Sequence, residues 1–220
     1  MFDAEPEGWA RLRLRDLFRE RKEHGHHGLP IASVSIESGL VLRSTLDRRV
    51  VSALGHEDHA LVRKNDIVYN MMRMWQGACG LAKADCLVSP AYVVMTPSPT
   101  ISPDFALEML RSPAVMKLLR AYSQGVVDDR LRLYPDAFGQ IPVSIPPLDE
   151  QRRIAEVMQA ADNQIAAQNA VVEKLRDLQW ATFASFLRSG NVCGQAEEIS
   201  SWVTGRIDGI ARLPPGWKIT

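Results

Sequence analysis

The sequence predicts an α+β globular domain followed by one long α-helix of the kind that forms coiled coils. Short strand-like and helical patterns occupy the chain up to residue 145, and from Glu150 to Arg188 no proline or glycine interrupts a helical pattern. A chain of 220 residues, 46% of them hydrophobic, is long enough for one domain with its own core and an appendage. A second globular domain does not fit.

The globular part combines short strands with short helices. Ser102-Pro103 and Ser112-Pro113 each place an N-cap residue before a proline at the first helical position, which predicts helices at 103–111 and 113–123. A short helix and a loop are expected within residues 16–28, and extended or loop structure from 125 to 145. Alternation or β-branched runs predict strands at residues 9–14, 31–36, 66–70 and 91–95. We expect the two ends of this domain to lie near one another.

The long helix should begin close to Asp149. Pro142, Pro146 and Pro147 cannot continue a helix and favour extended backbone before them, whereas Asp149 is a good N-cap and Glu150 suits the positive end of the helix dipole. A helix of about forty residues is about 60 Å long, which suits a spacer better than a core helix.

Apolar or small side chains recur along this helix at three- and four-residue spacing, which predicts a seam that packs on another long helix. With no second helix of that length expected in the chain, the seam should be partly exposed in a monomer and promote homodimerisation. Gln168 and Gln179 interrupt it, either to specify register or because that face meets solvent. The seam consists of Ile154, Met158, Ala161, Ile165, Val172, Leu175 and Phe186.

Composition excludes several classes of protein. The 26 basic and 26 acidic residues cancel, so bulk attraction to nucleic acid is not expected and any DNA binding depends on local groups. Three cysteines without a Cys-x-x-Cys pair favour reduced thiols, and the chain shows no leader and no membrane-spanning run, so we expect a cytoplasmic protein. His24, His26 and His27 lie beside glycines without acidic or thiol ligands, so no metal is predicted.

The best candidates for DNA contact lie after the predicted strand at 66–70. Arginine commonly reads guanine, asparagine and glutamine read adenine, and an aromatic side chain packs on bases, which singles out Asn70, Arg73, Trp75 and Gln76. The alternative for Trp75 is a place in the core. Lys83 is a further candidate for DNA contact, Arg63 and Lys64 add charge nearby, and a second basic group runs from Arg11 to Lys22. Arg130 and Arg132 are secondary candidates, unless Asp128 and Asp129 neutralise them.

Catalytic motifs of DNA-modifying enzymes are missing from the sequence. It contains no Asn/Asp-Pro-Pro-Tyr/Phe loop or glycine-rich loop for S-adenosylmethionine, no paired acidic residues spaced as in a nuclease, and no Gly-x-x-x-x-Gly-Lys-Ser/Thr for ATP. We therefore expect no catalytic residues and no cofactor of its own.

Three stretches resemble the specificity (S) subunits of type I DNA restriction-modification enzymes. The most specific is Ile-Pro-Pro-Leu-Asp-Glu-Gln-Arg-Arg-Ile-Ala at 145–155, followed by the long helix. The others are residues 66–77, continuing to Val-Ser-Pro-Ala-Tyr at 88–92, and Trp-Val-Thr-Gly-Arg-Ile-Asp at 202–208. The resemblance implies a target-recognition domain at 1–148, a spacer or dimerisation helix at 149–189, and a connector at 190–220 that leads toward a second recognition domain.

The resemblance also implies a function. Each recognition domain of the family reads one half of a split double-stranded DNA target, and the spacer helices set the distance between the halves. Adenine methyltransferase (M) subunits and a restriction (R) subunit assemble on them, so S-adenosylmethionine, ATP and Mg²⁺ are expected on those partners only. Pro6-Glu7-Gly8-Trp9 returns as Pro214-Pro215-Gly216-Trp217, so the chain is either the front half of a longer subunit or a half-subunit that dimerises. The alternative is a coiled-coil scaffold that binds only proteins, which the neutral charge favours.

Overall fold

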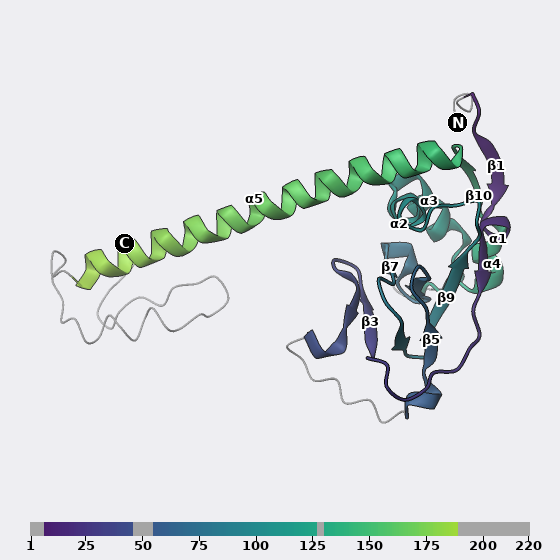
Figure 1. Ribbon diagram of the computed structural model, residues 1–220, viewed down its shortest axis with the longest axis horizontal. Coiled ribbons are helices and arrows are strands. Elements are labelled where there is room, and N and C mark those ends of the chain that lie inside the picture. The colour runs from purple at the N-terminus through teal and green to yellow at the C-terminus, as the bar shows by residue number, and fades with distance from the viewer. Residues whose placement is uncertain (1–6, 46–54, 127–129, 189–220) are drawn as a thin grey trace. The chain divides into compact units, whose positions relative to one another are not determined.

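The computed structural model describes residues 7–45, 55–126 and 130–188, of which 186–188 as backbone only. The chain divides into two compact units, Met1–Gln159 and Ala160–Thr220. No helix in the described ranges combines the length and hydropathy that crossing a membrane requires. The fold class is the predicted one, a mixed α+β domain and a long helix (Figure 1).

The elements follow one another along the chain in mixed order. The strands are β1 Ala10–Arg13, β2 Phe18–Glu20, β3 Ala32–Ser35, β4 Gly39–Leu42, β5 Ala60–Val62, β6 Ile67–Asn70, β7 Cys79–Leu81, β8 Cys86–Val88, β9 Tyr92–Pro97 and β10 Pro142–Ile145. The α-helices are α1 Leu14–Leu17, α2 Pro103–Arg111, α3 Pro113–Tyr122, α4 Pro135–Gln140 and α5 Leu148–Arg188, and short 3-10 turns are η1 Arg43–Thr45, η2 His56–Asp58 and η3 Met74–Gln76.

A four-stranded antiparallel sheet of order β2-β9-β6-β7 lies at the centre of the domain. Its strand β6 is buried on both faces, because Ile67 and Tyr69 enter one hydrophobic cluster while Val68, pointing the opposite way, enters another. The first cluster lies among the helices, and the second lies under the β3–β4 and β5–β8 pairs. Burial on both faces explains why this strand reads as a continuous apolar run.

The two ends of the domain are joined as expected. Strand β1 pairs antiparallel with β10, with Ala10 opposite Ile145 and Arg13 opposite Pro142. The pairing brings the start of the described chain next to the segment that leads into α5 (Figure 1).

The long helix begins at Leu148, two residues before the start that an N-cap at Asp149 predicts. The carbonyl of Pro147 accepts the amides of Glu150 and Gln151, both at 3.0 Å, so Asp149 lies inside the first turn. Its carboxylate instead accepts from Arg152 at 3.3 Å. Asp149 still places negative charge at the positive helix end, which is the part of the prediction that depends on charge.

Gln151 attaches the first turn of α5 to the domain. Its side chain is 1% exposed; Oε1 accepts from the amide of Ser102 at 2.9 Å, and Nε2 donates to the carbonyls of Pro146 at 2.9 Å and Thr100 at 3.2 Å. One buried carboxamide thus satisfies three main-chain groups at once and holds the start of the helix against the domain.

Other predictions for local structure were partly wrong. The helices at α2 and α3 agree with the predicted ranges to within a residue, but the short helix expected within 16–28 lies at α1, and β2 follows it directly. Helix α4 interrupts the stretch that we expected to be extended or loop. Pro135 at its first position and Asp136 in its first turn are start signals that were present in the sequence.

Candidate nucleic-acid interface

Asn70 and Arg73, the central candidates from the sequence, stand on a tight turn at the end of β6. The Asn70 carboxamide oxygen accepts the amide of Met72 at 3.0 Å, and the Asn70 carbonyl accepts the amide of Arg73 at 3.0 Å. The amide of Ala78 then donates to the Arg73 carbonyl at 3.1 Å. These bonds hold the backbone under both side chains, so the two groups are presented from a rigid base.

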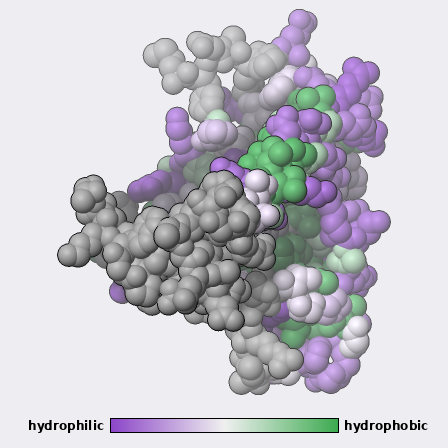
Figure 2. Space-filling view, turned by 90° about the vertical axis from the view of Figure 1, so that its left-hand side faces the viewer, coloured by the Kyte–Doolittle hydropathy of each residue, from purple (hydrophilic) through white to green (hydrophobic). Residues whose placement is uncertain are grey.

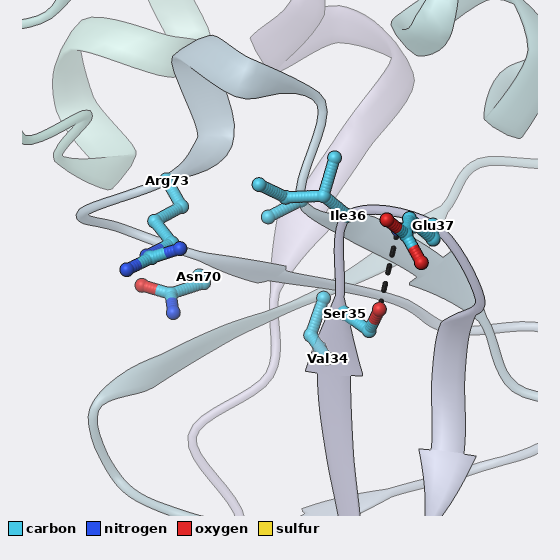
Figure 3. A pocket seen from close by; sticks show the side chains of 7 residues that line it. Val34, Ser35, Ile36, Glu37, Asn70 and Arg73 are labelled. Atoms are coloured by element: carbon cyan, nitrogen blue, oxygen red, sulfur yellow. Dashed lines mark hydrogen bonds between the residues drawn. The ribbon is translucent and has the colours of Figure 1, made fainter. Parts of the chain in front are cut away.

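Both side chains border a hollow of about 330 Å³ (Figure 3). The Arg73 and Asn70 head groups lie beside one another on one side of it, and the turn between β3 and β4 forms the other side. Arg73 is exposed, and within the described ranges its guanidinium makes no ion pair or hydrogen bond. The hollow is lined by Val34, Ser35, Ile36, Glu37, Asn70, Arg73 and Ala78.

The β3–β4 turn was not among the predicted site residues. The Ser35 hydroxyl accepts the amides of Glu37 and Ser38, both at 3.2 Å, and Gly39 closes the turn with φ +65°. The signals available in the sequence were the polar Glu37-Ser38-Gly39 at the end of a predicted strand. These signals do not reveal that the turn faces Arg73, because only the tertiary structure brings the two segments together.

The hairpin is seated on β7 by a close backbone approach. A Cβ added to Gly80 would lie 2.1 Å from the amide nitrogen of Leu40, so no larger residue fits there without displacing β4. Arg111 reinforces the contact, since its Nη2 donates to the Cys79 carbonyl at 2.6 Å and lies against Gly39. The wall of the hollow that carries Glu37 is therefore fixed by backbone packing.

Trp75 is half-buried and already engaged. Its Nε1 donates to the Met72 carbonyl at 3.1 Å, and the guanidinium of Arg120 lies 5.0 Å from the ring centroid in cation–π geometry. Gln76 is half-buried beside it, and the backbone N–H of Gln76 donates to the Arg73 carbonyl at 3.0 Å. The contacts of Trp75 fasten η3 to α3, so it supports the turn rather than standing free in the hollow.

The remaining candidate cations differ in their surroundings. Lys83 is exposed and pairs with Asp104 of α2 at 2.9 Å. Arg132 is exposed, and its backbone pairs with Gln124 through two hydrogen bonds of 2.8 Å. Arg130 is exposed as well. Asp128 and Asp129, the expected neutralising partners, lie outside the described residues.

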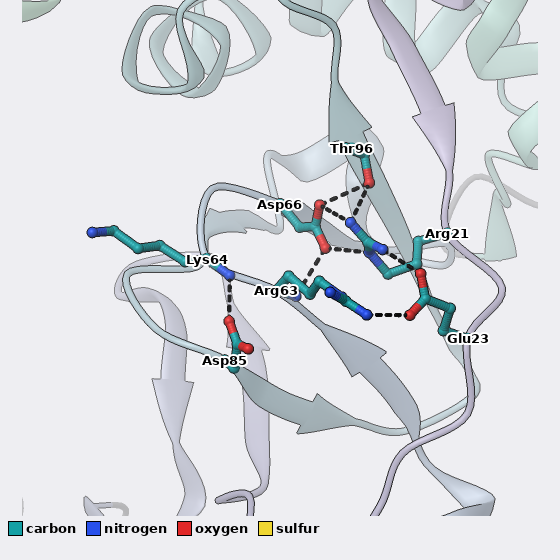
Figure 4. Close-up of polar contacts among 7 residues, drawn as sticks. All are labelled: Arg21, Glu23, Arg63, Lys64, Asp66, Asp85 and Thr96. Atoms are coloured by element: carbon teal, nitrogen blue, oxygen red, sulfur yellow. Dashed lines mark hydrogen bonds and ion pairs between the residues drawn. The ribbon is translucent and has the colours of Figure 1, made fainter.

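Arg21 and Arg63, members of the predicted basic groups, belong to a polar network (Figure 4). Arg21 Nε donates to the buried Asp66 carboxylate at 2.6 Å, and Thr96 donates to the same carboxylate at 2.8 Å. The hydrogen bond with Asp66 raises the pKa of Arg21, and those from Arg63 and Arg21 lower the pKa of Glu23. These cations are occupied by carboxylates, which leaves less charge for DNA than the sequence suggested.

A second hollow, of about 440 Å³, lies beside this network. Arg21, Arg63, Lys64 and Arg152 contribute to its lining, and Lys64 is exposed with its backbone amide bound to Asp85 at 2.8 Å. Because Arg21 and Arg63 are paired with carboxylates, this hollow offers less free positive charge than its list of cations suggests.

Most of the predicted seam of α5 is open to solvent. Met158, Ile165, Val172 and Leu175 are 41%, 55%, 45% and 59% exposed, and Ala161, Gln168 and Gln179 are exposed as well. Ile154 instead packs against the core of its own domain, and the Phe186 side chain lies outside the described residues. Hydrophobic side chains at the surface are visible among hydrophilic ones in Figure 2.

The exposed apolar surface of α5 is wider than one seam. Sequence reasoning missed a group of large side chains that are also exposed, although Val157, Val171 and Leu178 lie at multiples of seven residues from one another. They are Val157, Val171, Leu178, Trp180 and Phe183. An apolar arc this broad is typical of a helix that contacts more than one neighbour.

The histidines lie near one another without forming a metal site in the part of the chain that the structure describes. The rings of His27 and His56 are 4.8 Å apart, and His59 is 1% exposed with Nδ1 2.7 Å from the Gly55 carbonyl. Within those ranges no group of three or more potential ligands comes together.

In a comparison with known families, residues 6–176 match a family described as type I restriction modification DNA specificity domain. No match is found among curated proteins.

Several solved structures are similar in fold. A structure of complex assembly and conformational transition of the type I R-M system has 18% identity and a TM-score of 0.56, and covers 80% of this chain and 44% of its own. The HsdS subunit from Thermoanaerobacter tengcongensis has 17% identity and a TM-score of 0.51, and the match covers 75% of this chain and 40% of the HsdS subunit. The type I restriction-modification S subunit from M. genitalium has 15% identity and a TM-score of 0.52, and the match covers 86% of this chain and 48% of that S subunit. The chain thus spans less than half the length of these proteins.

Proposed function

This chain belongs to the family of type I restriction modification DNA specificity domains, and we propose that it is the sequence-specific DNA-recognition component of such a system. Its globular domain reads one half of a bipartite double-stranded target. It carries out no chemistry itself, and it directs methylation, and restriction where a restriction subunit joins, to that site.

The observation that carries this proposal beyond the family is the hollow bordered by Asn70 and Arg73. An exposed guanidinium and a carboxamide on a rigid turn are the groups that read guanine and adenine edges in the major groove. Both stand beside a concave surface rather than on a convex one, so a base edge can approach them together. Neutral net charge agrees with recognition by few local contacts instead of bulk attraction.

The long helix supplies the scaffold in this proposal. Its exposed apolar residues need a partner, and a second long helix followed by methyltransferase subunits would cover the wide arc that includes Leu178 and Trp180. That second helix comes either from a further part of the same protein or from a second copy of this chain. S-adenosylmethionine, ATP and Mg²⁺ then belong to the partner subunits.

DNA binding is tested by selecting bound duplexes from a random pool, with the chain alone and with a type I methyltransferase subunit present. We expect a preferred sequence whose binding weakens as salt rises. Arg73→Ala should cost about 1–3 kcal/mol on the preferred duplex and little on random duplex, since a base contact carries discrimination. An equal loss on both would make Arg73 a phosphate contact, and no loss would remove it from the interface.

The noncatalytic role is tested by transfer of labelled methyl groups from S-adenosylmethionine to DNA. The purified chain should transfer none, and transfer should appear when a methyltransferase subunit is added. Deletion of residues 160–188, which leaves the first turns of α5 packed on the domain, should abolish it, because the deleted part of the helix is the proposed docking surface. Transfer at an enzyme-like rate by the chain alone would overturn this assignment.

A scaffold that binds only proteins remains the competing function. It predicts helix-mediated association without any preferred duplex in the selection.

A further inference from the structure

Glu37 occupies the side of the hollow opposite Asn70 and Arg73 (Figure 3). It stands on the turn between β3 and β4 and is exposed, and within the described ranges its carboxylate accepts no hydrogen bond and makes no ion pair. A cation and a carboxylate thus border one concave surface without neutralising each other. Arg21 and Glu23 elsewhere in the domain do pair, so the separation here is a property of this hollow.

This mixture of charge determines what the hollow can bind. A phosphate would gain from Arg73 but would be repelled by Glu37, and a purely electrostatic site would not place a carboxylate there. The major-groove edges of base pairs, in contrast, carry both acceptors and amino donors. Arginine is complementary to guanine O6 and N7, and a glutamate accepts from the N4 amino group of cytosine.

The turn that carries Glu37 is held in place before any ligand arrives. The Ser35 hydroxyl binds the amides of Glu37 and Ser38, and the contact of Gly80 with Leu40 seats the hairpin on β7. A preorganised acceptor loses little conformational freedom on binding, and it discriminates well because it cannot move aside for a wrong base.

We propose that Glu37 is a specificity-determining residue that accepts a hydrogen bond from a cytosine N4 amino group, within the same half-site that Arg73 contacts. This inference rests on the proposed function, because it assigns a base to the site that reads DNA. A carboxylate in this role lowers affinity for DNA in general while it raises discrimination for one base.

The experiment therefore measures two quantities, the preference for one base and the affinity for random duplex, which should respond differently to the loss of the carboxylate. Duplexes are selected from a random pool with the unchanged chain and with Glu37→Gln, Glu37→Ala, Arg73→Ala and the control Glu156→Gln, an exposed glutamate of α5. The unchanged chain and the control should require cytosine at one position. Glu37→Ala should lower that requirement about 5- to 150-fold, the range for one good base contact, and Glu37→Gln should shift it toward adenine. Affinity for random duplex should stay the same or rise in both.

The result separates failure of this inference from failure of the proposed function. If the unchanged chain selects a sequence and Arg73→Ala relaxes it, but the Glu37 variants keep the preference intact, the inference is wrong and the DNA-reading function stands. Equal loss of affinity for selected and random duplex in the Glu37 variants would also overturn it, since that pattern indicates a structural role. If the unchanged chain selects no sequence under any condition, both fall together. Because Glu37 is exposed on a turn, its variants should fold, which circular dichroism and thermal unfolding verify.

Discussion

The globular domain and the long helix obtain their stability in different ways. In the domain, large side chains such as Tyr69, Phe138 and Leu110 are completely buried, and two hydrophobic clusters lie on opposite faces of one sheet. Along α5, in contrast, the side chains from Glu156 to Phe183 are all exposed, including Leu178 and Trp180 at 63%. The domain carries its own core, whereas the helix has an apolar surface that only another chain segment can cover.

This difference suits the globular domain to recognition and the long helix to assembly. A rigid core can hold the turn of Asn70 and Arg73 in one geometry, which is what discrimination between bases requires. A helix with an unfilled apolar face is suited to association, because burial of that face is the driving force for pairing. Four changes test this division, from the largest expected effect to the smallest.

Phe138→Ala should affect the domain most. The Phe138 ring is fully buried and packs against Phe18 and Tyr69 with centroid separations of 5.7 and 5.3 Å. Its truncation should lower the free energy of unfolding by about 3–5 kcal/mol, measured by urea denaturation. A change below 1 kcal/mol would mean that this cluster does not carry the stability of the domain.

Leu175→Ala should weaken association of the helix and leave the stability of the domain almost unchanged. Leu175 is 59% exposed, so its truncation should hardly change the urea midpoint of the domain. It should weaken association of the helix by about 1.5–3 kcal/mol, roughly tenfold or more in Kd, which sedimentation equilibrium can measure. Lys174→Ala is the matched control outside the predicted seam. A strict monomer at high micromolar concentration, with the helix well ordered, would argue against pairing through this surface.

Gln151→Ala tests the connection between the two regions. The substitution removes the partner of the Ser102 amide and of two carbonyls in a buried place, and should cost about 1–3 kcal/mol in unfolding free energy. Gln164→Ala, further along the same helix and exposed, provides the comparison. Equal stability of the two variants would show that the first turn of α5 is not fixed by this side chain.

The smallest effect concerns the buried thiols. Burial raises the pKa of Cys86 to about 11 from an ordinary 9.0, and it also raises the pKa of Cys79. The unfolded chain therefore loses these protons at lower pH than the folded domain does. The free energy of unfolding should fall as pH rises from about 9 toward 11, and the fall should be shallower in Cys86→Ala. Parallel pH profiles for the two proteins would contradict this.

Part of the fold was readable from local signals, and the misses have specific causes. Ser-Pro pairs specified α2 and α3, and three prolines before an uninterrupted run specified the start of α5 to within two residues. Strands β2, β5, β7 and β8 are only three residues long, too short for alternation to become visible. Helix α4 is six residues long and contains a glycine, so its start signals were outweighed by composition.

Only one side of the candidate site, the side with Asn70 and Arg73, was predicted from the sequence. Asn70 and Arg73 were predicted because their side chains match base edges, a property of residue type, and they do border a hollow. Glu37, thirty-three residues before Asn70, was missed because nothing local relates a hairpin turn to a distant strand end. The occupation of Arg21 and Lys83 by carboxylates was missed for the same reason.

The sequence by itself determined the α+β class, the position of the helix junction and the resemblance to a DNA specificity domain, because capping, proline geometry and hydrophobic periodicity act between residues close in the chain. Only the tertiary structure decided which cations remain available and which side chains face each other across the hollow. Those outcomes depend on sheet order and on the close contact of Gly80 with β4, and packing between distant segments has no local signature.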